Sequence, residues 1–336
     1  MLTQCGISLQ VRHPAHSNSM MAKGSCPHIL LIVLVLLLGS VRPTSAAYRI
    51  TAMLSSGLQP YIEAMQGFQD IIDAAVPVHG PKSITYADIK EYILDEIPLR
   101  GDQRQAILAD RPDLLVAIGT NALNFVKKKS ADIPIVYLMV PYPAGIINGR
   151  TNISGVNMQI SPARQLDALL AAVPRLKRFG LIYDPILLGS LLKEIKEAAR
   201  EKEITLLAKP TQTSSAVQDL LDGMAGRIDC FWMLPDLTVV TPENVELILL
   251  FSLENRVPVF SFSAKYLTRG AAFAVTFDNY DMGRSAAEMA MKILAGQGAG
   301  TLTPIEPQTI KLEINHSVVS KLGIPISNSS DQGNTP

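Results

Sequence analysis

From Tyr48 onward, short runs of apolar residues alternate with segments whose apolar residues recur every three or four positions. The clearest run is Leu114–Ile118, which follows Pro112 and is followed by the turn Gly119–Asn121 and a helix-like segment, 122–128. Such runs predict strands buried on both faces, and the amphipathic segments predict helices. Further strands are predicted at 49–54, 83–86, 135–140, 179–183, 205–208, 230–234, 259–262, 271–277 and 308–314. Further helices are predicted at 60–75, 99–109 and 162–173. One more includes 191–199, one ends near 225, one begins at 241 and one ends near 294.

Strands that alternate with helices form parallel sheets with right-handed crossovers. About five such units precede residue 156, and about five more lie between it and residue 262. A chain of 336 residues also suggests two domains. We therefore predict an α/β protein with two Rossmann-like lobes, between which the last two units are divided.

The first 47 residues are predicted to be a secretory signal peptide. The ten-residue apolar run Ile29–Leu38 follows Lys23 and leads to Ser45-Ala46-Ala47, small residues of the kind that a signal peptidase accepts. The run is too short for a transmembrane span. Cleavage is expected after Ala47, with Ala46 as the alternative, and an uncleaved anchor is the competing interpretation.

Two details refine this prediction. Met20 or Met21 is an alternative start, because residues 1–19 add nothing that a signal needs. Ser40 stands where a lipoprotein signal would carry its lipidated cysteine, so no lipid anchor is expected. The periplasm is the expected location.

The polar tail 327–336 is predicted to be disordered.

Composition argues against several functions. Thirty Lys and Arg balance thirty Asp and Glu, so the chain lacks the basic field of a nucleic-acid binder. Cys230 is the one cysteine after the leader and is expected in the core, which excludes an intramolecular disulfide and a cysteine metal site. His79 and His316 are the only histidines there, and the sequence lacks a nucleophile elbow, a P-loop and a G-x-G-x-x-G motif. We expect no enzyme activity, no cofactor and no metal.

An ordered set of short motifs gives the chain a resemblance to a known family. The set comprises Ser55-Ser56, Pro60-Tyr61, Gly67-Phe68, Asp113–Thr120, Ile133–Val136, Asn152–Val156, Pro174–Gly180, Pro258–Phe260, Phe277–Arg284 and Leu322–Pro325. Together they resemble the substrate-binding proteins of ABC transporters with the type I periplasmic-binding fold, in the branch that includes tryptophan and tyrosine binders.

The resemblance implies two lobes joined by three crossovers, near 156–160, 263–270 and 298–307. The first lobe would hold 48–159 and 271–297, and the second would hold 160–270 and 298–326. The lobes would close on a small ligand by hinge motion. An ABC permease at the inner membrane is the implied partner, and the protein is expected to be a monomer.

The carboxyl ends of the strands are the expected ligand site. Hydroxyl, amide and backbone N–H groups at Ser55, Ser56, Thr120 and Asn121 suit a carboxylate. The carboxylates of Asp236 and Asp278 suit an ammonium, and Tyr142, Tyr183 and Tyr280 offer flat apolar walls. The predicted ligand-binding set is Ser55, Ser56, Thr120, Asn121, Tyr142, Tyr183, Asp236 and Asp278, each of which has a competing role as a cap, a turn or an exposed loop residue.

One departure from the family's sequence pattern weakens any inference of the ligand from relatives. The family usually has an Asp-Pro pair after its fourth strand, where this chain reads Val140-Pro141-Tyr142-Pro143. The leading hypothesis is a solute-binding component of an importer for an amino-acid-like or aromatic solute. The alternatives are a ligand-sensing module of the same fold that signals to a membrane partner, and a periplasmic enzyme that uses Ser and Asp.

Overall fold

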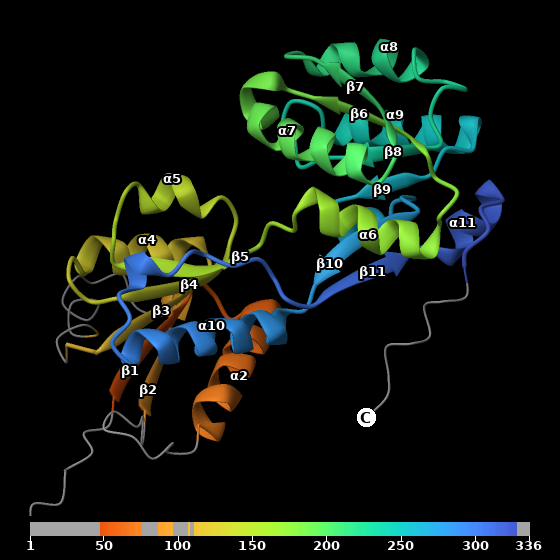
Figure 1. Cartoon of the computed structure of the whole chain (residues 1–336). Coiled ribbons are helices and arrows are strands. Elements are labelled where there is room, and N and C mark those ends of the chain that lie inside the picture. The colour runs from red at the N-terminus through yellow and green to blue at the C-terminus, as the bar shows by residue number, and fades with distance from the viewer. Residues whose placement is uncertain (1–47, 76–86, 97–106, 108–110, 328–336) are drawn as a thin grey trace, which may run out of the picture. The chain divides into compact units, whose positions relative to one another are not determined.

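Two separate sheets organise the chain (Figure 1). The computed structural model describes residues 48–75, 87–96, 107 and 111–327, and these belong to one compact unit, Ala46–Pro336. The signal peptide, the expected helix 99–109, the strand 83–86 and His79 lie wholly or mostly outside the described residues.

The first sheet is entirely parallel and has the order β2-β1-β3-β4-β5. All side chains of β3 and β4 are buried, as their continuous apolar sequences predicted. Helices α2, α4, α5 and α10 accompany this sheet. Its strands are β1 (Tyr48–Leu54), β2 (Ala87–Ile93), β3 (Leu114–Ile118), β4 (Ile135–Val140) and β5 (Ile153–Asn157), and the helices are α2 (Gln59–Ala74), α4 (Thr120–Lys129), α5 (Pro143–Ile147) and α10 (Asn279–Leu294).

The second sheet has the order β11-β10-β9-β8-β6-β7. Trp232 fills its centre with an edge contact to Phe179 and a tilted contact to Phe260. Its strands are β6 (Arg178–Tyr183), β7 (Thr205–Pro210), β8 (Cys230–Met233), β9 (Val259–Ser261), β10 (Phe273–Phe277) and β11 (Ile310–Ile314). The helices of this part are α6 (Pro162–Ala172), α7 (Pro185–Glu201), α8 (Val217–Asp222), α9 (Pro242–Asn255) and α11 (His316–Leu322), and one-turn 3-10 helices lie at η1 (Leu94–Glu96), η2 (Ser214–Ala216), η3 (Ala264–Tyr266) and η4 (Ala299–Thr301).

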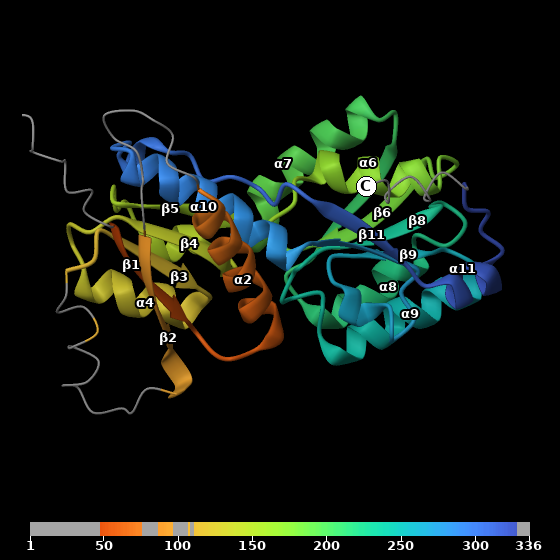
Figure 2. The same cartoon turned by 90° about the horizontal axis from the view of Figure 1, so that it is seen from below.

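The assignment of 271–297 to a single lobe was wrong for its strand. Strand β10 pairs with β9 in the second sheet, whereas the next helix, α10, packs against α2 of the first (Figures 1 and 2). The sequence analysis kept the strand and its helix together as one βα unit. The chain instead leaves the second sheet within that unit, at Asp278.

The expectation of purely parallel sheets also needs one correction. Strand β11 runs antiparallel to β10, with Phe277 opposite Ile310. After α10 the chain returns to the second sheet beside the carboxyl end of β10, which it left at Phe277. A strand that enters the sheet at that end has to run back along its neighbour.

A buried tyrosine links β4 to the end of β5 in the first sheet. The Tyr137 side chain on β4 is fully buried, and its hydroxyl donates to the Oδ1 of Asn157 at 2.7 Å. Burial raises the pKa of this hydroxyl to about 12.

Tyr137 should therefore make stability pH-dependent in alkali. Between pH 10 and about 12 the unfolded chain has released this proton and the folded chain keeps it. The free energy of unfolding should fall by roughly 1.4 kcal/mol per pH unit in this window. Urea unfolding from pH 9 to 12 measures the slope, and Tyr137→Phe should flatten it. An equally steep slope in that variant would contradict the assignment.

Candidate functional site

The strands of the first sheet end in a polar corner. Leu54 of β1 lies opposite Ile118 of β3, so the loops that follow these strands begin side by side. Ser55 begins one loop and Gly119 begins the other. In open α/β sheets this edge is where ligands are held.

Ser55 caps the helix that follows the neighbouring strand. Its Oγ accepts a hydrogen bond from the Ala122 amide at 3.0 Å, and its own amide donates to the Ile118 carbonyl at 2.8 Å. Gly119 has a φ of 92°, and a Cβ there would lie 2.5 Å from the Ser55 Oγ. The corner therefore requires glycine at position 119.

Thr120 and Asn121 form the open end of this corner. They are the first two residues of α4, where backbone N–H groups have no intrahelical partner. Thr120 is half-buried and Asn121 is exposed, and no other described residue bonds to their side chains. Ser56 is half-buried beside them. The predicted group of four thus lies together, in a geometry that suits an anionic group.

The second sheet carries an acidic corner. Asp184 follows β6 and Asp236 follows the adjacent β8. The Asp236 carboxylate accepts hydrogen bonds from the amides of Asp184 at 2.6 Å, Thr238 at 2.9 Å and Val239 at 3.3 Å, and its residue is 1% exposed. The buried Asp236 carboxylate therefore holds the backbone of this corner in place.

Asp184 completes this network. Its carboxylate accepts from the Thr238 hydroxyl at 2.8 Å and from the Ile186 amide at 2.8 Å. These hydrogen bonds, that from the Thr238 side chain above all, hold the pKa of Asp184 below its usual value. None of the described cations forms a salt bridge with Asp184 or Asp236. The corner thus holds two carboxylates supported by neutral donors, an arrangement that attracts a cation.

Tyr142 connects this corner with the loop after β4. Its backbone is left-handed, with a φ of 52°, and a short helix, α5, follows where the sequence predicted a loop. The hydroxyl donates to the Pro235 carbonyl at 3.4 Å, although 69% of the residue is exposed. Desolvation of the hydroxyl, followed by the nearby Asp236 carboxylate, raises the pKa of Tyr142.

The last two predicted residues have different surroundings. Tyr183 ends β6 half-buried against the core of the second sheet. Asp278 caps α10, accepting from the Asp281 amide at 3.1 Å and from the Lys311 Nζ at 2.6 Å. The Lys311 hydrogen bond is the main reason that the pKa of Asp278 is lowered. Its partners among the described residues thus lie outside both corners, and the Tyr280 hydroxyl likewise donates elsewhere, to Asp70 at 2.6 Å.

Sequence reasoning identified tyrosines at these edges but missed the exposed aliphatic side chains beside them. Eight large apolar or aromatic side chains are the exposed ones among the described residues, and six of them follow the carboxyl ends of strands. Leu237 is 86% exposed and Leu58 is 61% exposed. The sequence signal that could have identified these residues is a large apolar residue within a polar turn. The six are Leu58 after β1, Tyr142 after β4, Ile186 and Leu187 after β6, Leu237 after β8, and Tyr280 after β10.

Comparison with known proteins identifies relatives. The family model for ABC transporter substrate binding proteins matches residues 99–331. A tyrosine-binding protein from Clostridioides difficile (strain R20291) is 22% identical over 236 residues, which are 68% of this chain and 68% of that protein.

Solved structures share the fold. The ligand-free, open structure of a substrate-binding protein with adhesive properties from Clostridium difficile has a TM-score of 0.66 and 20% identity, over 84% of this chain and 97% of that one. A Streptococcus pneumoniae ABC domain in complex with L-Trp has a TM-score of 0.50 and 18% identity, with the same coverage. Both are similar in fold to this chain, which confirms the predicted type I periplasmic-binding architecture.

Proposed function

Since this chain belongs to the family of ABC transporter substrate-binding proteins, we propose that it binds an aromatic amino acid for import. Members of such a family bind a substrate and do not convert it, in agreement with the prediction that the chain is no enzyme. The tyrosine-binding relative and the L-Trp complex make an aromatic zwitterion the first ligand to test.

The observation that carries this proposal is the group of exposed apolar side chains beside the two polar corners. Covering an exposed leucine with an apolar group of a ligand is favourable because it removes apolar surface from water. An aromatic ring of the ligand would cover Leu58, Leu237 and Tyr142 and remove their apolar surface from water. A purely polar solute would leave them exposed.

The ends of the ligand match the two corners in charge. Its carboxylate would meet the N–H groups of Thr120 and Asn121 and the Ser55 and Ser56 hydroxyls. Its ammonium would face the Asp184 carboxylate, and the buried negative charge of Asp236 would attract it from behind that residue. Asp278, which Lys311 occupies, has the weaker case.

The remaining expectations complete the proposal. Residues 1–47 would be removed during export, and the mature protein would work as a monomer in the periplasm. It would close around the ligand by hinge motion and deliver it to a permease in the inner membrane. Among the described helices, none combines the length and the apolar character needed to cross a membrane.

Calorimetric titration with L-tyrosine and L-tryptophan tests the proposal. We expect saturable binding, which should be weakened about tenfold by Leu237→Ser because a buried leucine contact of about 1–2 kcal/mol is lost. Leu237 is 86% exposed in the free protein, so stability should be unchanged.

The matched control is Leu250→Ser. Leu250 is 52% exposed on α9, away from the strand ends, and its replacement should leave the affinity unchanged. Absence of binding by both amino acids at millimolar concentration would contradict the proposal. Equal effects of the two serine variants would place the ligand elsewhere.

A further inference from the structure

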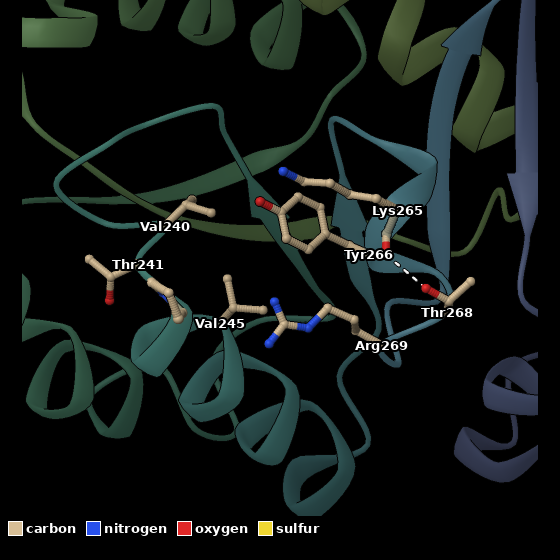
Figure 3. A pocket seen from close by; sticks show the side chains of 8 residues that line it. Val240, Thr241, Val245, Lys265, Tyr266, Thr268 and Arg269 are labelled. Atoms are coloured by element: carbon tan, nitrogen blue, oxygen red, sulfur yellow. Dashed lines mark hydrogen bonds between the residues drawn. The ribbon is translucent and has the colours of Figure 1, made fainter. Parts of the chain in front are cut away.

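A pocket of about 330 Å³ lies within the second sheet's part of the chain, next to the acidic corner but lined by other residues (Figure 3). Its volume lies within the range of small-molecule sites. One side is the start of α9, and the other is η3 with the turn that follows it. The first side provides the apolar groups of Val240, Pro242 and Val245, and none of the eight predicted site residues lines it.

The hydroxyl of a largely buried tyrosine points into this pocket. Tyr266 on η3 is 5% exposed, and its ring packs edge-on against Phe262. Figure 3 shows its hydroxyl directed toward Val240 and Thr241. This hydroxyl forms no hydrogen bond with a described residue, and it is not among the buried polar atoms that lack a partner, so solvent reaches it. A ligand carboxylate in the pocket would replace that solvent as its acceptor.

Two cations flank this hydroxyl. Lys265 places its Nζ over the Tyr266 ring, 4.8 Å from the centroid. Arg269 extends its guanidinium toward Val245, and its one salt bridge with a described residue, Glu246, is long at 3.8 Å and exposed. Lys265 lines the pocket and forms no salt bridge with a described carboxylate, whereas Glu246 partly neutralises Arg269.

The amino-terminal end of α9 does not by itself make this pocket an anion site. Thr241 caps the helix by accepting from the Asn244 amide at 3.2 Å. The Glu243 carboxylate lies in the first turn, where its own amide and the Thr241 hydroxyl lower its pKa. The helix end therefore already has an anion of its own. The case for a ligand depends on the cavity, the Tyr266 hydroxyl and the two cations.

We propose that this pocket binds a small organic carboxylate with an apolar body, at a site separate from the transport ligand. The carboxylate lies between Lys265 and Arg269 and accepts a hydrogen bond from the Tyr266 hydroxyl. The body of the ligand covers Val240, Pro242 and Val245. The turn before the pocket is tied to the acidic corner, because the Val240 amide donates to the Asp236 carbonyl at 2.8 Å.

Benzoate and its uncharged analogue benzamide are the probes. In methyl NMR spectra of the full chain, benzoate should shift the Val240 and Val245 methyl signals saturably at millimolar concentration. Benzamide should bind about tenfold more weakly, because it lacks the charge-assisted contacts. Lys265→Gln combined with Arg269→Gln should weaken benzoate about tenfold, and Tyr266→Phe about fivefold.

Two controls separate this site from the proposed function. Lys193→Gln removes an exposed cation of α7 and should leave benzoate binding unchanged. Excess L-tyrosine should leave the benzoate-induced shifts in place, whether or not L-tyrosine itself binds. Non-saturable shifts, equal responses to benzamide, or undiminished binding by the double variant would overturn the proposal.

Discussion

Replacing Gly283 with alanine should lower the free energy of unfolding by about 3 kcal/mol, at the upper end of overpacking effects. Gly283 lies in α10 where that helix meets α2. A Cβ at this position would lie 1.8 Å from the Ala64 carbonyl oxygen and 2.8 Å from the Phe68 amide nitrogen. The obstacle is backbone, so the two helices would have to separate. Gly67 on α2 makes the reciprocal close approach, since a Cβ at this position would lie 2.0 Å from the Tyr280 carbonyl oxygen.

Gly189→Ala is the matched control. Gly189 lies in α7, and a Cβ there would have no atom within 4 Å. Helix propensity alone should raise stability in this variant by about 0.5–1 kcal/mol. Urea unfolding followed by circular dichroism measures both variants. Equal effects at the two positions would mean that α2 and α10 do not pack closely.

Replacing Asp236 with alanine should cost about 3 kcal/mol of stability and abolish ligand binding. The change leaves the amides of Asp184, Thr238 and Val239 without their acceptor in a buried place. Each unsatisfied buried group costs roughly 1–3 kcal/mol. Asp222→Ala removes an exposed carboxylate that bonds to no described residue, and it should be nearly neutral.

The asparagine variant separates the two roles of Asp236. Asp236→Asn keeps one acceptor oxygen and should lose about half as much stability as the alanine variant. It also removes a negative charge, so affinity for L-tyrosine should fall while affinity for 3-(4-hydroxyphenyl)propionate, which lacks the ammonium, should not. Equal losses for both compounds would remove Asp236 from ammonium recognition.

The regular parts of the fold could be read from the sequence because their causes are local. The apolar strand Leu114–Ile118 and the Thr241-Pro242 helix start lie where pattern and capping rules placed them. The place of β10 could not be read in this way. A buried strand fits either sheet equally well, and only its pairing with Val259–Ser261 decides between them.

The positions of the candidate residues, unlike their roles, could be predicted from the sequence. Ser55, Thr120 and Asp236 were candidates because they follow predicted strands, and the structure places them after β1, β3 and β8. The sequence could not tell which way a side chain points, so it offered Asp236 as a free carboxylate although neighbouring amides hold it. Leu58 and Leu237 were missed because an exposed leucine in a turn looks like any other until its accessibility is known.

The docking of α10 on α2 sets an order in which the chain can fold. Helix α2 ends at Ala74 and its partner begins at Asn279, so the first sheet cannot complete its core until more than three quarters of the chain has been synthesised. Contacts so distant in sequence form slowly. A nascent chain would keep its amino-terminal half incompletely folded during this time, which would suit the export across a membrane that we propose.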